Sequence, residues 1–198
     1  FDWAVELFPW FEYYLKGIGD EPESYVQMQR NDGRWHIEET WPPEDVYGEI
    51  WEFDGFFGEW VSSTSGGFVY TFKLPGDSPI HISGLPTLHT DVSTGLCNGG
   101  QLFVTMKDGE SGLRLGHATM DVRYRDGGYE SKATSSLSSY RMLMEFNPMD
   151  VVVSSGWLTL EFTESGEDYI PSPCAASGLF VESVELYLPL IDREDEHE

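Results

Sequence analysis

The sequence predicts a mostly β sandwich domain preceded by a short helical segment. Hydrophobic residues make up 40% of the 198 residues and aromatic residues 15%, which is enough apolar volume for a core. The chain also contains 21 Gly and 11 Pro, residues that interrupt helices and form turns. Most of the chain alternates apolar and polar residues, as strands with one buried face do. Together these observations favour sheets over helices.

The first 18 residues are expected to form a helical segment. Apolar residues recur there every three to four positions, the spacing of one face of an amphipathic helix. These residues are Val5, Phe8, Phe11 and Leu15. Pro9 should kink the helix or begin a second one, and Gly17 and Gly19 should end it.

From residue 24 onward the pattern changes to the period of two that is typical of strands. Asn31-Asp32-Gly33 lies between the first two alternating segments and predicts a hairpin turn. Clusters of Gly, Pro, Asn and Ser separate the later segments, as in sandwiches and barrels. The expected strands cover residues 24–30, 34–41, 49–57, 68–74, 79–84, 87–94, 101–108, 118–125, 139–146, 157–165 and 179–188.

The net charge of −24, from 35 acidic and 11 basic residues, restricts the partners. Such a field repels nucleic acid phosphates and anionic lipids, so we expect no nucleic-acid or membrane binding. No apolar run reaches the ~18 residues of a membrane span. The acidity favours a halophilic or marine protein over one with a cationic partner, because the acidic residues spread along the whole chain. The compartment stays open, with the cytoplasm favoured.

The chain lacks a complete catalytic site of any common kind. A serine hydrolase needs a strained G-x-S-x-G elbow, an acid and a histidine. The nearest match is Gly109-Glu110-Ser111-Gly112, which falls in a loop between predicted strands. His81 and His89 could meet across a hairpin, but structural roles are favoured for them. We therefore predict no catalytic residue and no cofactor.

Metal and redox sites have little support. Cys97 and Cys174 could form one disulfide or remain two free thiols, and no C-x-x-C motif suggests zinc. Calcium could be held by loop carboxylates, although no EF-hand loop is present and no metal site is predicted. The loop positions considered are Asp108, Glu110, Asp126 and Asp168.

Aromatic residues are the candidate contact residues of the chain. They are dense between residues 51 and 60, where they could form a core, a domain interface or a surface that stacks on sugars. The candidate substrate or domain-interface residues are Trp35, Trp41, Trp51, Phe57 and Trp60. A carbohydrate-binding module is therefore an alternative function.

Several segments match the order of motifs in one enzyme family. Residues 10–17, WFEYYLKG, fit W-F-D-x-x-L-K-G, and residues 33–43 fit G-x-W-R-x-E-x-x-W-P with its flanking residues. Residues 80–86 and 116–125 fit V-x-I-x-G-x-P and G-x-L-R-A-R-Y-R more loosely. The chain thus resembles the C-terminal part of X-prolyl dipeptidyl-peptidases and cocaine-esterase-like serine hydrolases.

The resemblance implies a specific organisation. Residues 1–19 would be the end of an α/β-hydrolase domain, and residues 20–198 a jelly roll of galactose-binding-like fold. The catalytic Ser, Asp and His would lie before Phe1. The jelly roll would pack on the catalytic domain and help to shape its active site, and a homo-oligomer is possible. His36, Trp157 and Leu158 replace the family's Arg, His and Arg, so the substrate of the parent enzyme stays open.

Overall fold

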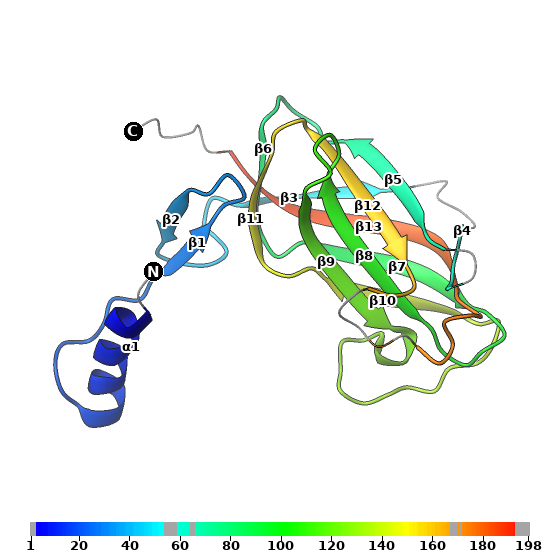
Figure 1. The fold of residues 1–198 in the computed structure, drawn as a ribbon, viewed down its shortest axis with the longest axis horizontal. Coiled ribbons are helices and arrows are strands. Elements are labelled where there is room, and N and C mark those ends of the chain that lie inside the picture. Colours follow the sequence, from blue (N-terminus) through cyan, green and yellow to red (C-terminus); the bar gives the residue numbers. More distant parts are fainter. Residues whose placement is uncertain (1–2, 54–58, 64–65, 167–169, 171, 193–198) are drawn as a thin grey trace.

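The structure is a computed structural model that describes residues 3–53, 59–63, 66–166, 170 and 172–192. Two antiparallel sheets pack face to face into a sandwich, and a separate hairpin and an N-terminal helix extend from one end (Figure 1). The predicted β sandwich with an N-terminal helical segment is therefore confirmed.

The N-terminal segment is helical through Pro9. An α-helix, α1 (Trp3–Phe11), continues into a π-helical turn, η1 (Glu12–Lys16). The helix ends at Gly17, whose φ of +67° is a left-handed conformation that glycine adopts without strain. Pro9 lies inside α1, so the alternative in which it begins a second helix is wrong, and the kink stays a prediction.

The hairpin follows the helix. Strands β1 (Val26–Gln29) and β2 (Trp35–Glu38) pair in antiparallel fashion. The predicted turn lies between them, where the backbone N–H of Arg34 donates to Asp32 Oδ1 at 2.9 Å and Gly33 has a φ of +86°. The second strand ends at Glu38, three residues earlier than its alternation predicts.

The larger sheet is organised around its longest strand, β13 (Leu179–Ile191). The main path of strands is β10 (Ser139–Glu145), β7 (Thr87–Thr94), β13, β6 (Ile80–Gly84) and β11 (Met149–Val153). Two further strands, β3 (Tyr47–Glu52) and β4 (Glu59–Val61), also pair with β13. In the main path, β11 is therefore the end strand beside β6.

The smaller sheet covers the inner face of the larger one. Its strand order is β5 (Phe68–Lys73), β12 (Trp157–Thr163), β8 (Gln101–Asp108) and β9 (Arg114–Asp121). After β9 the chain forms a short 3₁₀ helix, η2 (Val122–Tyr124). The expected strand at 118–125 thus begins earlier and ends earlier, because Asp121 Oδ1 accepts the Arg123 N–H and caps this helix.

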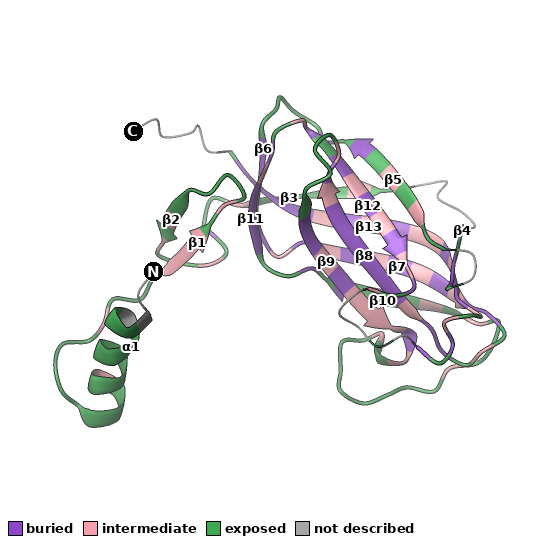
Figure 2. Ribbon diagram, in the orientation of Figure 1, coloured by how far each residue is buried: buried purple, intermediate pink, exposed green. Residues whose placement is uncertain are grey.

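The core lies between the two sheets. Residues at alternate positions of the facing strands are buried, as Figure 2 shows in purple, whereas the hairpin and helix are largely exposed. Phe162 is 1% exposed and its ring stacks on Phe68 with centroids 4.5 Å apart. Each aliphatic or aromatic side chain buried in this way contributes about 1.5–3 kcal/mol.

A disulfide joins two connections at one end of the sandwich. Cys97, between β7 and β8, bonds to Cys174, between β12 and β13, across 77 positions of sequence. Of the two alternatives that the sequence leaves open, the structure has the disulfide and not the free thiols.

Within the described parts of the chain, no helix is long and apolar enough to cross a bilayer.

Candidate functional site

The N-terminal segment presents an apolar surface that the rest of the chain leaves uncovered. None of the side chains described in residues 4–20 is buried. Leu15 is 72% exposed and Phe8 is 66% exposed. The other large exposed apolar side chains here are Val5, Leu7, Trp10, Phe11, Tyr14 and Ile18. A contiguous apolar surface of this kind marks an interaction site rather than ordinary surface composition.

The hairpin continues this surface toward the sandwich. Trp35 and Ile37 are 52% and 62% exposed, and they lie on one face of β2 because strand side chains alternate. His36, between them, points to the other face, where it is only 20% exposed. The two faces of β2 therefore have different roles, one apolar and open, the other polar and turned to the sandwich.

The hairpin turn binds the edge of the larger sheet. Asn31 Oδ1 accepts the backbone N–H of Val152 at 2.8 Å, and Asn31 Nδ2 donates to the Val152 carbonyl at 2.9 Å. Val152 lies on β11, so the asparagine amide satisfies backbone groups that an uncovered edge would leave open. Asn31 thus attaches the hairpin to the sandwich.

A buried carboxylate makes the second attachment. The Asp150 side chain is fully buried, and its Oδ1 bonds to His81 Nε2. These residues share a sheet face, because His81 is opposite Val152 and Asp150 is two positions away on the same strand. Asp150 Oδ2 is 3.0 Å from His36 Nδ1, and His36 Nε2 is 3.3 Å from Glu38 Oε1.

His36 lies between two carboxylates at this junction. Its ring nitrogens are within ion-pair distance of carboxylate oxygens, but neither nitrogen, nor Asp150 Oδ2, has a hydrogen bond among the described atoms.

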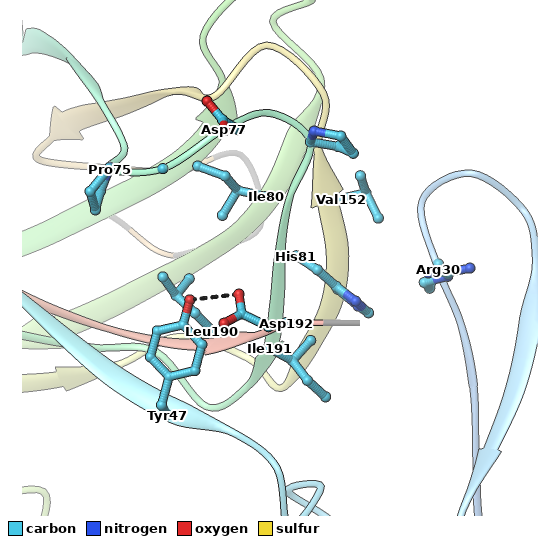
Figure 3. Close-up of a pocket in the computed structure, with 12 residues that line it drawn as sticks. Arg30, Tyr47, Pro75, Asp77, Ile80, His81, Val152, Leu190, Ile191 and Asp192 are labelled. Carbon is cyan, nitrogen blue, oxygen red and sulfur yellow. Dashed lines mark hydrogen bonds between the residues drawn. The ribbon is translucent and has the colours of Figure 1, made fainter. Parts of the chain in front are cut away.

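A cavity of about 280 Å³ lies beside this junction. Figure 3 shows Arg30 on the hairpin facing His81 and Val152 across the gap. At the sandwich side, the Tyr47 hydroxyl donates to Asp192 Oδ1 at 3.0 Å. Burial of the Tyr47 phenol, together with this hydrogen bond, raises its pKa above the usual value.

The candidate aromatic residues do not gather in one place. Trp35 lies on the hairpin, and Trp41 is half-buried in the loop that follows it. Trp51 is opposite buried Leu186 and packs inward, with its ring 6.4 Å from that of Phe72. Trp60 is opposite Phe180 instead, is 45% exposed, and its ring is tilted by 58° against that ring at a centroid distance of 5.4 Å. Phe57 lies outside the described residues.

The two histidines considered as a pair have separate partners. His81 bonds to Asp150, whereas His89 Nδ1 is 3.3 Å from an Arg141 guanidinium nitrogen on β10. The expectation that they could meet across a hairpin is therefore not supported.

The loop carboxylates considered for calcium serve other contacts. Asp108 Oδ1 accepts three hydrogen bonds, from the backbone and hydroxyl of Ser111 and from the Glu110 N–H. Burial raises the Asp108 pKa, but these bonds favour the carboxylate and hold the pKa below its usual value overall. Asp126 pairs with Lys132. Asp168 lies outside the described residues, and in the described ranges no three His, Cys, Asp or Glu side chains could hold a metal ion.

One buried acid lies directly after the end of β12. Glu164 is 3% exposed, and neither carboxylate oxygen has a hydrogen-bond partner among the described residues. It continues the inward series of Leu160 and Phe162 on β12, a signal that sequence reasoning could have used. Burial raises its pKa, since the charged form is poorly solvated.

Replacing Glu164 with leucine is expected to stabilise the protein at pH 7 by about 1–3 kcal/mol, because an unpaired buried polar group is lost. The folded state holds the Glu164 proton more tightly than the unfolded state, so the wild type loses stability as pH rises above the ordinary carboxyl pKa. The gain should therefore shrink as pH falls to 4. Urea unfolding at both pH values measures it.

The matched control is Glu161→Leu on the same strand, where Glu161 Oε2 pairs with Lys107 at 2.6 Å. That variant should show no gain. An equal gain from both variants would attribute the effect to strand propensity rather than to the buried charge.

No protein-family model matches the sequence, and no curated protein does. Comparison of the fold with solved structures, in contrast, gives clear matches. This chain has the fold of part of a CocE/NonD family hydrolase. The hydrolase of that family from Staphylococcus aureus aligns with a TM-score of 0.70 at 11% identity, over 95% of this chain and 46% of its own.

Two other enzymes align in the same way. An aminopeptidase from a marine sediment archaeon, Thaumarchaeota archaeon, gives a TM-score of 0.64 at 12% identity, over 93% of this chain and 43% of its own. An alpha-amino acid ester hydrolase gives 0.58 at 13%, over 93% of this chain and 44% of its own. The chain thus spans less than half the length of each of these enzymes. Their shared fold agrees with the fold that the sequence resemblance implies.

Proposed function

We propose that this chain is the non-catalytic C-terminal domain of a serine hydrolase resembling X-Pro dipeptidyl-peptidases and acyl esterases. In this proposal, residues 1–19 are the end of an α/β-hydrolase domain and residues 20–198 are the jelly roll. The jelly roll packs on the catalytic domain and helps to shape its active site. The complete enzyme transfers an acyl group to water through a serine ester.

The uncovered apolar surface of the N-terminal segment is the observation that carries this proposal. A helix of this length gains most of its stability from packing its apolar face, and the described residues of α1 and η1 include no buried side chain. Figure 2 shows the helix mostly exposed and lying away from the sandwich. A catalytic domain that covers Phe8 and Leu15 supplies the missing packing.

The lengths of the similar enzymes agree with this organisation. Each aligned region includes at least 93% of this chain but less than half of the enzyme, which leaves room in those enzymes for a further domain.

The carbohydrate-binding alternative has less support. A sugar platform needs exposed aromatic rings on one face. Trp51 packs toward Phe72 in the interior, and Trp60 faces the opposite side of the larger sheet.

The charge and the disulfide bear on the environment of the protein. A net charge of −24 spread along the chain favours a halophilic or marine source, where salt screens the self-repulsion. The Cys97–Cys174 disulfide favours an oxidising compartment over the cytoplasm that we expected from sequence.

The function is tested by assaying two purified proteins, this chain alone and this chain joined to the polypeptide that its gene encodes ahead of Phe1. Hydrolysis of an Ala-Pro p-nitroanilide and of p-nitrophenyl esters is measured. We expect turnover only from the longer protein, and loss of it when the serine of its G-x-S-x-G elbow is replaced with alanine. Turnover by the short chain, or by neither protein, would contradict the proposal.

A further inference from the structure

We propose that the cavity between the hairpin turn and the larger sheet binds a small zwitterion, a molecule with one carboxylate, one ammonium group and a short aliphatic body. A free aliphatic amino acid has this chemistry. The inference is separate from the proposed hydrolase role, because binding at this cavity needs no catalytic domain.

The hairpin turn forms one wall of the cavity because it is fixed to the edge of the sheet. Asn31 makes two hydrogen bonds to the Val152 backbone, at 2.8 and 2.9 Å. The residue before it, Arg30, is fixed by backbone bonds within the turn. Its N–H donates to the Arg34 carbonyl and its carbonyl accepts the Gly33 N–H, both at 2.9 Å. The Arg30 side chain therefore lines the cavity from the hairpin side, as Figure 3 shows.

The volume and the apolar lining of the cavity suit a small organic molecule. Its volume of about 280 Å³ equals the space of roughly nine water molecules at ~30 Å³ each. Half of its lining residues are proline or aliphatic, namely Pro75, Pro79, Ile80, Val152, Leu190 and Ile191. Such walls give water few hydrogen-bond partners and favour an aliphatic group in its place. The volume limits the occupant to about the size of one amino acid.

Charges of opposite sign lie on opposite walls of the cavity. Arg30 faces it from the hairpin, whereas Asp77, between β5 and β6, and Asp192, directly after β13, face it from the sandwich (Figure 3). Arg30 Nη2 is 3.8 Å from Asp32 Oδ2, a distance too long for a hydrogen bond, so a closer carboxylate would compete for the guanidinium. The two aspartates attract an ammonium group. A ligand with both charges matches both walls.

The polar groups of the sandwich wall are held in place before a ligand arrives. The Tyr47 hydroxyl donates to Asp192 Oδ1 at 3.0 Å, and the other carboxylate oxygen can accept from an ammonium group. The His81 ring, which also lines the cavity, is fixed by the bond from its Nε2 atom to Asp150. Groups that are already ordered reduce the entropy cost of binding.

The net charge of the chain ranks the ligands that carry only one of the two charges. A protein with a net charge of −24 attracts cations and repels anions. We therefore expect an aliphatic amine to bind better than an aliphatic carboxylate of similar size. Each should bind more weakly than the amino acid that combines them, because each lacks one charged partner.

NMR titration of the full chain tests the site with three probes. These are L-leucine, 4-methylpentanoate, which lacks its ammonium group, and 3-methylbutylamine, which lacks its carboxylate. The backbone amides of Gly76, His81 and Val152 report the cavity, since these residues line it. We expect saturable shifts of these signals with leucine. The amine should bind about tenfold more weakly than leucine, and the carboxylate more weakly still.

Variants assign each charge of the ligand to its wall. Arg30→Gln should weaken leucine binding about tenfold or more and leave 3-methylbutylamine binding unchanged. The double variant Asp77→Asn and Asp192→Asn should weaken the binding of leucine and of the amine. Arg34→Gln is the matched control, because Arg34 belongs to the same turn but its side chain is 59% exposed and does not line the cavity. It should bind leucine as the wild type does.

The Asn31 side-chain amide signal shows whether the hairpin stays attached in each variant, since this amide bonds to Val152. Shifts that do not saturate, or equal affinities for the three probes, would overturn the proposal. Leucine binding that is unchanged in Arg30→Gln with the hairpin attached would overturn it too. If Arg30→Gln detaches the hairpin, the ranking of the three probes on the wild-type chain decides the question.

Discussion

Replacing both Cys97 and Cys174 with serine is expected to lower the free energy of unfolding by about 4 kcal/mol. The bond closes a loop of 77 positions that includes β8, β9, β10, β11 and β12. Without the bond, the unfolded chain regains the freedom of this loop, and the entropy of closing it rises with its length. Because domains are stable by about 5–15 kcal/mol in total, this loss is a large part of the whole.

Urea unfolding followed by circular dichroism measures the change, and a reductant supplies the control. A thiol reductant should bring the wild type to the stability of the double serine variant and leave that variant unchanged. Equal stability of the oxidised wild type and the variant would show that the bond is absent in solution or constrains nothing. The same measurement at low and high salt separates the disulfide from the effect of the −24 net charge, since only charge repulsion is screened by salt.

The strands that the sequence predicts are those with one buried face. β7, for example, alternates half-buried and buried residues along its whole length, and its predicted bounds, 87–94, are those observed. β11 was missed for the opposite reason. Four of the five residues of Met149–Val153 are buried, so the strand has no alternation to detect, and its short apolar run is ambiguous. β4 is only three residues long and falls below the length that a period can reveal.

The candidate site was predictable only in part. The apolar helix face was visible, because Phe8, Phe11 and Leu15 recur at helical spacing within one short segment. The buried contact between His81 and Asp150 was not, because these residues are 69 positions apart and meet only through the pairing of β6 with β11. His36 drew attention as a replacement for the family's arginine.

Replacing Asp150 with alanine is expected to lower the free energy of unfolding by about 1–3 kcal/mol, because the variant removes the buried acceptor that bonds to the His81 ring and leaves that ring without it. His81 is 9% exposed and loses the acceptor of its Nε2 atom. His36 keeps only Glu38. The loss should exceed that from His36→Gln alone, since His81 belongs to the folded sheet and His36 to the hairpin.

An exposed ion pair provides the comparison that separates burial from charge. Asp126 contacts Lys132 with both side chains about half exposed, so Asp126→Ala should change the free energy of unfolding by at most about 1 kcal/mol. In a background of His36→Gln and His81→Gln, Asp150→Ala should lose much less than it does in the wild type, because the rings that contact Asp150 are already absent. Urea unfolding at pH 6 supplies all four free energies of this cycle. If the loss from Asp150→Ala and the loss from the two histidine replacements simply add, Asp150 stabilises the sandwich independently of the histidines. That result would contradict the prediction.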